Sequence, residues 1–189
     1  MDNNVPVIAD DDIRKANILI VDGQEIGARS LQDVLHEAGY SNVNVTTNPF
    51  AVAELHRANH YQIILLDIEM PDKNGFQVME DLKSIANGDY LPVLALSVEP
   101  AYKLHALKRG AKDFITKPFD AQEVLTRVHN MLEVRLKHED ALEAVTTLEK
   151  LAQQDPLTGL ANRRLLTKNI SAGIANASRM NSLRRVWRR

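Results

Sequence analysis

The sequence predicts an α/β protein with a five-stranded parallel sheet, doubly wound by helices on both faces, and with an extended C-terminal helix. Five short runs of β-branched and aliphatic residues alternate with segments whose apolar residues recur at helical spacing. Strands that alternate with helices in this way pair in parallel. After the fifth run, residues 121–154 contain no Gly or Pro, which predicts one helix of roughly 50 Å.

The strands are expected where apolar runs stop at a polar residue or a turn. The first run, Ile-Leu-Ile-Val, has no polar alternation, which is typical of a strand buried on both faces. The five expected strands are residues 18–21, 43–47, 63–66, 93–96 and 113–116.

The helices are expected between these strands, with recognisable start and stop residues. Gly39 and Gly110 are suited to helix C-termini, and Asp120 is suited to capping the fifth helix, with Glu123 as a capping-box partner. The expected helical segments cover residues 31–35, 49–57, 76–82 and 102–109 and begin again at residue 121.

Composition divides the chain into four segments. Residues 1–15 are polar and predicted to be disordered, residues 16–136 form the globular domain, residues 137–154 form a connecting helix, and residues 155–189 are basic. The last segment has eight Lys or Arg against one acid, a charge of +7, whereas the first 154 residues carry −9. Ala141, Val145, Leu148 and Ala152 follow 4-3-4 spacing, so the connecting helix is either solvated or a coiled coil.

Several protein classes are excluded or disfavoured by composition. The chain has no cysteine, so disulfides and thiolate metal sites are excluded. The N-terminus lacks the basic and apolar order of a signal peptide, and the apolar runs are too short to cross a bilayer. We therefore expect a soluble, cytoplasmic protein with no membrane partner.

Four of the expected strands end next to a residue with useful chemistry. These residues are Asp22, Asp67, Ser97 and Lys117. Each alone is more often a turn, a cap or a solvated surface residue. Parallel strands bring their carboxyl ends to one edge, where ligands of such sheets bind. Two carboxylates, a hydroxyl and an ammonium there suit phosphoryl transfer to a carboxylate, with a divalent cation held by oxygen ligands.

These residues lie in stretches that resemble the receiver domain of bacterial response regulators, a flavodoxin-like fold of the CheY type. The resemblance covers about residues 17–136 and is carried by residues 18–22, 63–75 (IILLDIEMPDKNG), 93–97 and 111–119 (AKDFITKPF). It implies that Asp67 is the phosphoacceptor, that Ser97 is the switch hydroxyl and that Lys117 contacts the phosphate. Phe114 is then the switch aromatic.

The resemblance also implies a cofactor and a local backbone geometry. Mg²⁺ would be bound by Asp22, by Asp67 and by the main-chain carbonyl of Glu69. Members of the family have a cis peptide bond before the proline that corresponds to Pro118.

Two residues depart from the family pattern. In the family, a second acid usually follows the residue that corresponds to Asp22, but here that position is Gly23. The absence of this acid calls the affinity for magnesium into question. Glu25 is the nearest substitute in the sequence. The residue after the switch hydroxyl is usually very small, but here it is Val98, which would narrow the path to Asp67.

A second resemblance begins at residues 155–164 (DPLTGLANRR), which resemble the opening of a GGDEF domain, the fold of diguanylate cyclases. In that family the asparagine that corresponds to Asn162 lies near the guanine base. Only 25 residues follow Arg164, and the chain has no Gly-Gly pair, so we expect a truncated start and no cyclase activity. The basic ending, SLRRVWRR, is expected to be a solvated tail without specific nucleic-acid binding.

The sequence therefore predicts a phosphoacceptor rather than a turnover enzyme, with a histidine kinase or phosphotransfer protein as partner. Phosphorylation would reshape the face formed by residues 102–109, 113–116 and the helix from residue 121, and a homodimer through this face and the long helix is a candidate output. Two alternatives remain. The chain is a degenerate receiver that acts as an interaction module without phosphorylation, or it is the input half of a diguanylate cyclase.

Overall fold

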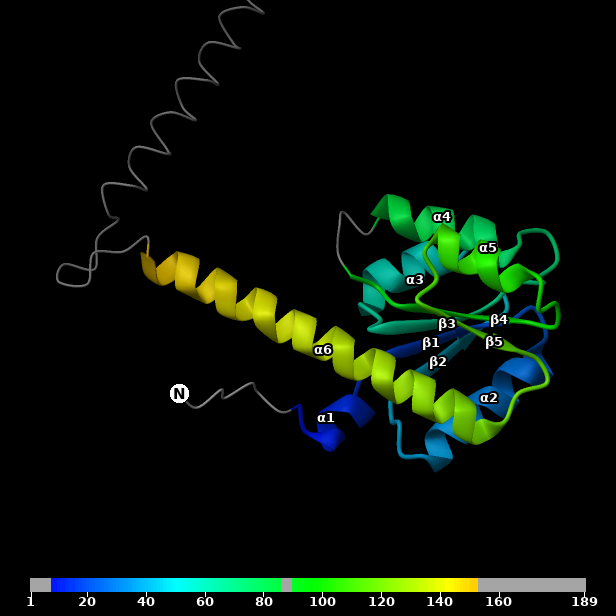
Figure 1. Cartoon of the computed structure of the whole chain (residues 1–189), viewed down its shortest axis with the longest axis horizontal. Helices are drawn as coiled ribbons and strands as arrows, with labels where there is room; N and C mark the ends of the chain where they lie inside the picture. The colour runs from blue at the N-terminus through cyan, green and yellow to red at the C-terminus, as the bar shows by residue number, and fades with distance from the viewer. Residues whose placement is uncertain (1–7, 86–89, 153–189) are drawn as a thin grey trace, which may run out of the picture. The chain divides into compact units, whose positions relative to one another are not determined.

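A five-stranded, all-parallel sheet forms the centre of the chain, as predicted (Figure 1). The computed structural model of the chain describes residues 8–85 and 90–152. The strands are β1 (Ile18–Val21), β2 (Val43–Thr46), β3 (Ile63–Asp67), β4 (Val93–Ser97) and β5 (Asp113–Thr116), in the spatial order β2-β1-β3-β4-β5. This is the doubly wound, CheY-like flavodoxin fold, in which the strand order reverses between β1 and β3.

Helices cover both faces of the sheet (Figure 1). The helices are α1 (Asp10–Arg14), α2 (Glu25–Glu37), α3 (Val52–Asn59), α4 (Gly75–Ile85), α5 (Tyr102–Arg109) and α6 (Ala121–Ala152). α1, α2 and α6 lie on one face, and α3, α4 and α5 lie on the other.

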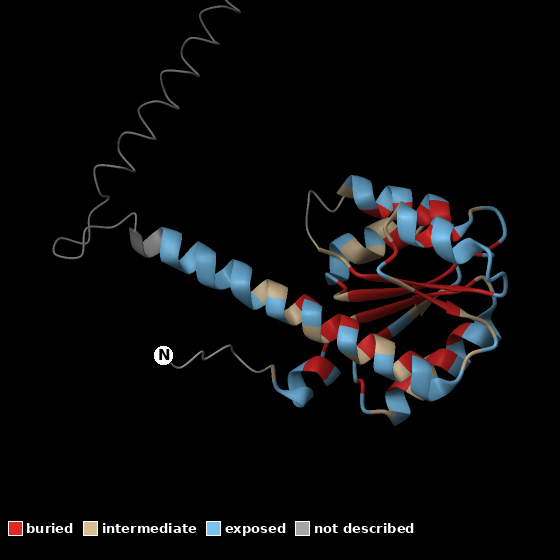
Figure 2. Cartoon of the chain, in the orientation of Figure 1, coloured by how far each residue is buried: buried red, intermediate tan, exposed pale blue. Residues whose placement is uncertain are grey.

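Each face has its own hydrophobic core, because successive strand residues point to opposite sides of the sheet. In β1, Ile18 and Ile20 join the core under α2 and α6, whereas Leu19 and Val21 join the core under α3, α4 and α5. All residues of β1, β3 and β4 are buried (Figure 2). Burial on both faces explains why these strands read as continuous apolar runs.

The expectation that residues 1–15 are disordered is wrong for α1. Ile13 in this short helix is 2% exposed and packs into the core under α2 and α6. Arg14 Nη1 also donates a hydrogen bond to the Ala38 carbonyl, at the C-terminus of α2, over 2.8 Å. The apolar contact and the capped carbonyl together order a segment whose composition is polar.

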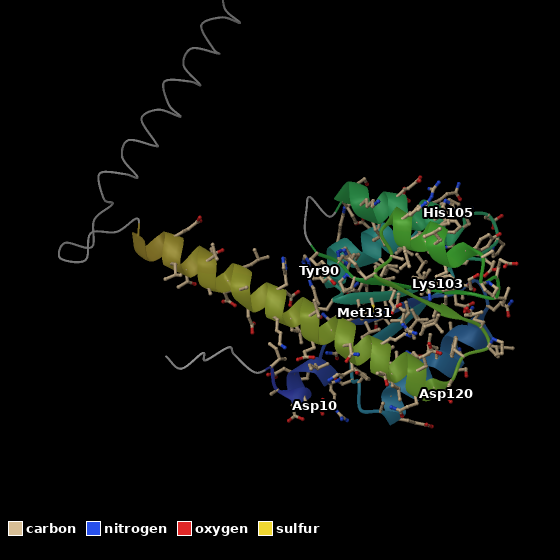
Figure 3. All side chains as sticks on the ribbon, viewed as in Figure 1. Asp10, Tyr90, Lys103, His105, Asp120 and Met131 are labelled. Carbon is tan, nitrogen blue, oxygen red and sulfur yellow. The ribbon has the colours of Figure 1, made fainter. Side chains whose placement is uncertain are left out.

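The long helix α6 begins at its predicted cap. Asp120 Oδ1 accepts hydrogen bonds from the backbone N–H groups of Gln122 (2.8 Å) and Glu123 (3.2 Å), and Asp120 is labelled at the start of the helix in Figure 3. The Glu123 side chain binds Arg127 instead of closing a capping box. The chain divides into two compact units, Met1–Glu139 and Asp140–Arg189. In the second unit, residues 140–149 of α6 are exposed on every side.

Among the described residues, no helix is long and apolar enough to span a membrane. The proposed GGDEF-like stretch, Asn162 and the basic ending lie outside the described residues.

Candidate functional site

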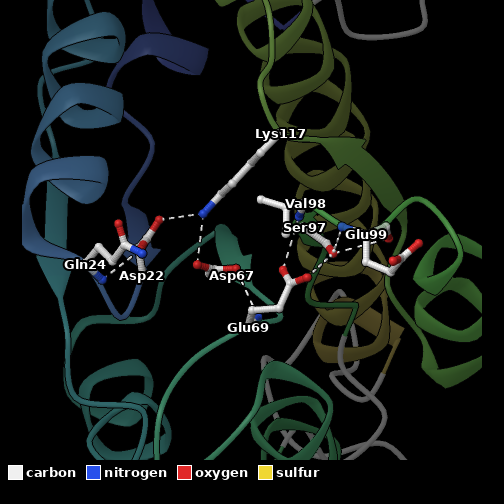
Figure 4. Close-up of polar contacts among 8 residues, drawn as sticks. All are labelled: Asp22, Gln24, Asp67, Glu69, Ser97, Val98, Glu99 and Lys117. Atoms are coloured by element: carbon white, nitrogen blue, oxygen red, sulfur yellow. Dashed lines mark hydrogen bonds and ion pairs between the residues drawn. The ribbon is translucent and has the colours of Figure 1, made fainter.

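The four residues predicted from the strand ends lie at one edge of the sheet. Asp67 is the last residue of β3 and Ser97 the last residue of β4, while Asp22 and Lys117 directly follow β1 and β5. The register pairs Asp67 with Leu96 and Ser97 with Thr116, so these strand ends are level with one another. Figure 4 shows Lys117 directed at both Asp22 and Asp67, and Ser97 in contact with Glu69 next to them.

Lys117 joins the two aspartates. Its Nζ donates hydrogen bonds to Asp22 Oδ2 over 2.8 Å and to Asp67 Oδ2 over 2.9 Å. Both aspartates are 4% exposed, whereas the side chain of Lys117 is 22% exposed. The ammonium therefore offsets one of the two negative charges and reduces the repulsion between the buried carboxylates.

The second oxygen of each aspartate is held by the backbone. Asp22 Oδ1 accepts a hydrogen bond from the N–H of Gln24 over 2.8 Å, and Asp67 Oδ1 accepts one from the N–H of Glu69 over 3.0 Å. These bonds fix the rotamers of both carboxylates and direct their other oxygens toward Lys117.

The titration of these groups reflects burial and charge together. Burial raises the pKa of Asp67 above its ordinary value, while the hydrogen bond and charge of Lys117 oppose that rise. Burial alone would lower the pKa of Lys117, but the hydrogen bonds and charges of Asp22 and Asp67 raise it above its ordinary value. Lys117 is therefore protonated at neutral pH.

The loop after Asp67 depends on Gly75. A Cβ atom at this position would lie 2.5 Å from the carbonyl oxygen of Asp67 and 2.9 Å from Cα of Ile68. Gly75 N also donates a hydrogen bond to the Ile68 carbonyl over 3.1 Å. Because only glycine permits this close backbone approach, Gly75 holds the loop against the end of β3.

The two residues that are predicted to form the switch are both buried. Ser97 has no exposed surface, and Phe114 in β5 is 3% exposed and packs in the core under α3, α4 and α5. The Lys117–Pro118 peptide bond is cis, as predicted.

The structure locates the two departures from the family pattern. Gly23 packs against the loop after β3, because a Cβ atom there would lie only 2.8 Å from Pro71 Cδ. Glu25, the candidate substitute acid, instead pairs with Arg29 over 2.7 Å and is largely exposed. Val98 is 63% exposed, so its side chain is not packed into the site.

The donor set suits a hard divalent cation. Asp22 and Asp67 offer buried carboxylate oxygens, which are compatible with a magnesium ion that keeps several waters. The main-chain carbonyl of Glu69 is the third ligand that the family resemblance predicts. In the described part of the chain, no group of three or more His, Cys, Asp or Glu side chains could hold a metal. Water would therefore complete the coordination.

The side chain of Glu69 was missed by the sequence analysis, which considered only its carbonyl. Its carboxylate accepts hydrogen bonds from Ser97 Oγ over 3.0 Å and from the N–H of Val98 over 3.2 Å (Figure 4). The sequence did contain a signal for this contact, because Glu69 is an acid two residues after Asp67. A side chain just beyond the end of β3 can reach the neighbouring end of β4.

Comparison with known proteins gives the class of this chain. Residues 18–129 match the response regulator receiver domain family, and the chain belongs to that family. It is 32% identical over 148 residues to the response regulator MprA of Mycobacterium bovis (strain BCG / Pasteur 1173P2), a match that covers 77% of this chain and 63% of MprA. It is 34% identical over 116 residues to the sensory transduction protein RegX3 of Mycobacterium tuberculosis (strain ATCC 25618 / H37Rv), which covers 61% of this chain and 50% of RegX3.

Shorter relatives are matched over nearly their whole length. The chemotaxis protein CheY of Thermotoga maritima is 30% identical over 114 residues, which are 60% of this chain and 95% of CheY. The solved receiver domain of the Francisella response regulator 1452 is 27% identical with a TM-score of 0.57, and the match covers 65% of this chain and 99% of that chain. By contrast, the chain spans less than two thirds of MprA and half of RegX3. The comparisons support a two-component response regulator.

Proposed function

We propose that this chain accepts a phosphoryl group on Asp67 from a histidine kinase or a phosphotransfer protein, and acts as a switch rather than a turnover enzyme. The observation that carries this proposal is the buried Asp67 carboxylate, held between Lys117 and the N–H of Glu69 at the carboxyl edge of the sheet. An oxygen of Asp67 forms a bond to phosphorus as the bond between phosphorus and the donor breaks.

The surrounding groups receive the charge that this transfer brings. Lys117 can turn from Asp67 to a phosphoryl oxygen, and Ser97 can donate its hydroxyl hydrogen to another. A bound Mg²⁺, held by Asp22, Asp67 and the carbonyl of Glu69, would supply Lewis-acid neutralisation of the phosphoryl oxygens.

The output would follow from the positions of Ser97 and Phe114. Ser97 ends β4 and Phe114 lies in β5, so a shift at the site changes the face formed by α5, β5 and α6. On α5, Leu104 is 63% and Leu107 is 37% exposed, and exposed apolar side chains suit a surface that binds another protein.

The exposed part of α6 supports a homodimer as one output. Leu142, Val145 and Leu148 are 49%, 54% and 65% exposed. Val145 and Leu148 belong to the 4-3-4 seam that starts at Ala141, and Leu142 lies next to it. Side chains on such a seam are buried when two helices form a coiled coil. A sizing experiment with and without a phosphoryl mimic would show whether phosphorylation controls this association.

The coiled coil makes a specific prediction. Replacing Val145 and Leu148 together by glutamate should raise the dimer dissociation constant by at least about tenfold, because both positions lie on the predicted seam. Sedimentation velocity over a concentration series would measure it. Thr147→Glu adds one acid of the same kind outside the seam and should leave association almost unchanged. Equal behaviour of the two variants would contradict a coiled coil through this seam.

Asp67→Asn tests the phosphoacceptor. Intact mass after incubation with magnesium and a small-molecule phosphodonor should show one phosphoryl adduct in the wild type and none in the variant, because an amide oxygen cannot form the acyl phosphate. An adduct of equal yield on the variant would place the acceptor elsewhere. No adduct on the wild type, even at high magnesium, would favour a degenerate receiver that acts as an interaction module.

The segment after α6 is the basis of a further alternative. We propose that residues 155–164 correspond to the start of a GGDEF-type domain that is truncated here and followed by a basic tail, so that the receiver would serve as the input half of a diguanylate cyclase in a longer chain. Cyclase activity would require that longer chain, and a cyclase assay on the 189-residue chain should show none.

A further inference from the structure

The Glu69 side chain binds two hydrogen-bond donors at the end of β4. One carboxylate oxygen accepts from Ser97 Oγ over 3.0 Å and the other accepts from the N–H of Val98 over 3.2 Å (Figure 4). The residue itself is exposed, whereas Ser97 is fully buried. An exposed carboxylate thus reaches inward to a buried hydroxyl and to the first backbone amide beyond the strand.

The hydroxyl hydrogen of Ser97 goes to Glu69. Ser97 Oγ accepts a hydrogen bond from the N–H of Glu99 over 2.9 Å, and it lies 3.3 Å from the Glu99 carbonyl and 3.0 Å from Glu69. A serine hydroxyl has one hydrogen to donate, and an ionised carboxylate is the stronger acceptor. The Ser97 hydroxyl and the Val98 N–H, which we call the donor pair, are therefore both directed at Glu69.

This donor pair lies beside Asp67. β3 and β4 are hydrogen-bonded neighbours, Asp67 is paired with Leu96, and the N–H of Ile68 donates to the Leu96 carbonyl over 2.9 Å. A hydroxyl and a backbone N–H that converge on one point form a typical binding site for an oxyanion. A phosphoryl group on Asp67, at the neighbouring strand end, could accept from these same donors, which the Glu69 carboxylate occupies in this structure.

We propose that Glu69 is an internal competitor of the phosphoryl group, occupying the Ser97 hydroxyl and the Val98 N–H until phosphorylation displaces it. This inference rests on the proposed role of Asp67. The two anions carry like charges, so the phosphoryl group displaces the carboxylate and does not share the donors with it. Because Glu69 is exposed, it can swing into solvent without disturbing the core, and the barrier that it adds is modest.

Removal of the carboxylate should speed phosphorylation. Glu69→Gln has the same size but no charge, and its single amide oxygen can accept from only one of the two donors, whereas Glu69→Ala frees both. With magnesium and a small-molecule phosphodonor, we expect the rate of adduct formation measured by intact mass to rise about three- to tenfold in both variants. Glu54→Gln, on the exposed surface of α3, removes the same charge elsewhere and should leave the rate unchanged.

A second measurement needs no phosphorylation. Amide hydrogen exchange of Val98, followed by NMR, should be faster in Glu69→Ala than in the wild type, because the amide loses its acceptor. Unchanged exchange would show that the carboxylate does not hold this amide and would overturn the inference.

The combined outcomes separate this inference from the proposed function. An adduct that forms at the same rate in all chains would overturn the competition while leaving Asp67 as the acceptor. Slower phosphorylation of Glu69→Gln with a weaker dependence on magnesium would overturn the competition and would indicate that the Glu69 side chain is a metal ligand instead. No adduct in any chain, together with altered Val98 exchange, would reject the phosphoryl assignment and with it the competition, and would leave Glu69 as a structural contact.

Discussion

Replacing Lys117 by methionine is expected to lower the free energy of unfolding at pH 7 by about 2–3 kcal/mol and to reduce phosphorylation by at least about a hundredfold. Lys117 is the ammonium shared by Asp22 and Asp67, and its removal leaves two buried carboxylates without their cation. Loss of one partner from a fully buried pair costs about 3–5 kcal/mol. The side chain of Lys117 is 22% exposed, so water reduces that cost.

This loss of stability should depend on pH. Without Lys117, the pKa of Asp67, already raised by burial, loses its main opposing influence. A carboxyl whose folded pKa lies above its unfolded pKa, about 3.9, contributes stability that is complete below the unfolded value and lost as pH rises through the folded one. The deficit of Lys117→Met should therefore shrink on acidification toward pH 4.

In the wild type, the stability that Lys117 contributes is lost in the alkaline pH range. The pKa of Lys117 is raised, so the stability that it contributes is present below its unfolded pKa of about 10.4 and is lost as pH rises through the folded value.

Urea unfolding of the wild type and the variant at several pH values would measure both effects. Lys103→Met, which removes a lysine from the exposed surface of α5 (Figure 3), controls for the change in net charge and should cost little. If the loss of unfolding free energy caused by Lys117→Met stays constant from pH 4 to pH 8, then unpaired carboxylates are not the cause of that loss.

The sheet was predictable because its strands are buried on both faces. A run such as residues 63–66 has no polar residue to allow an exposed face, and its end at Asp67 coincides with the last residue of β3. The helices were less accurate at their ends. The second predicted helix was expected at residues 49–57, and it is observed as α3 at Val52–Asn59. Helix ends depend on local backbone hydrogen bonds, which apolar spacing does not report.

The site was predictable as a set of strand ends but not as a set of contacts. Parallel topology alone brings Asp22, Asp67, Ser97 and Lys117 to one edge. The contact of the Glu69 carboxylate with Ser97 depends on a side-chain rotamer and on the path of a loop, neither of which is written in residue spacing. The same holds for α1, where the burial of a single apolar side chain, Ile13, orders a polar segment.

Gly23→Asp should tighten magnesium binding by about tenfold, because it adds a second carboxylate beside Asp22 and the ion's affinity rises with the number of charged oxygen ligands. The gain should come with a loss of stability of about 1–3 kcal/mol. A Cβ atom at residue 23 would lie 2.8 Å from Pro71 Cδ and 3.4 Å from Met70 Cα, so the loop after β3 must move. Isothermal titration with Mg²⁺ and urea unfolding would measure the two effects.

Gly23→Ala separates the charge from the crowding, because it introduces the same Cβ atom without a carboxylate. Both variants should lose stability to a similar extent, and combining either with Pro71→Ala should recover part of the loss. Only Gly23→Asp should bind Mg²⁺ more tightly than the wild type. If it binds no more tightly than Gly23→Ala, then the missing acid does not limit the affinity. In that case the Lys117 ammonium, which already lies between Asp22 and Asp67, is the competitor that a divalent ion must displace.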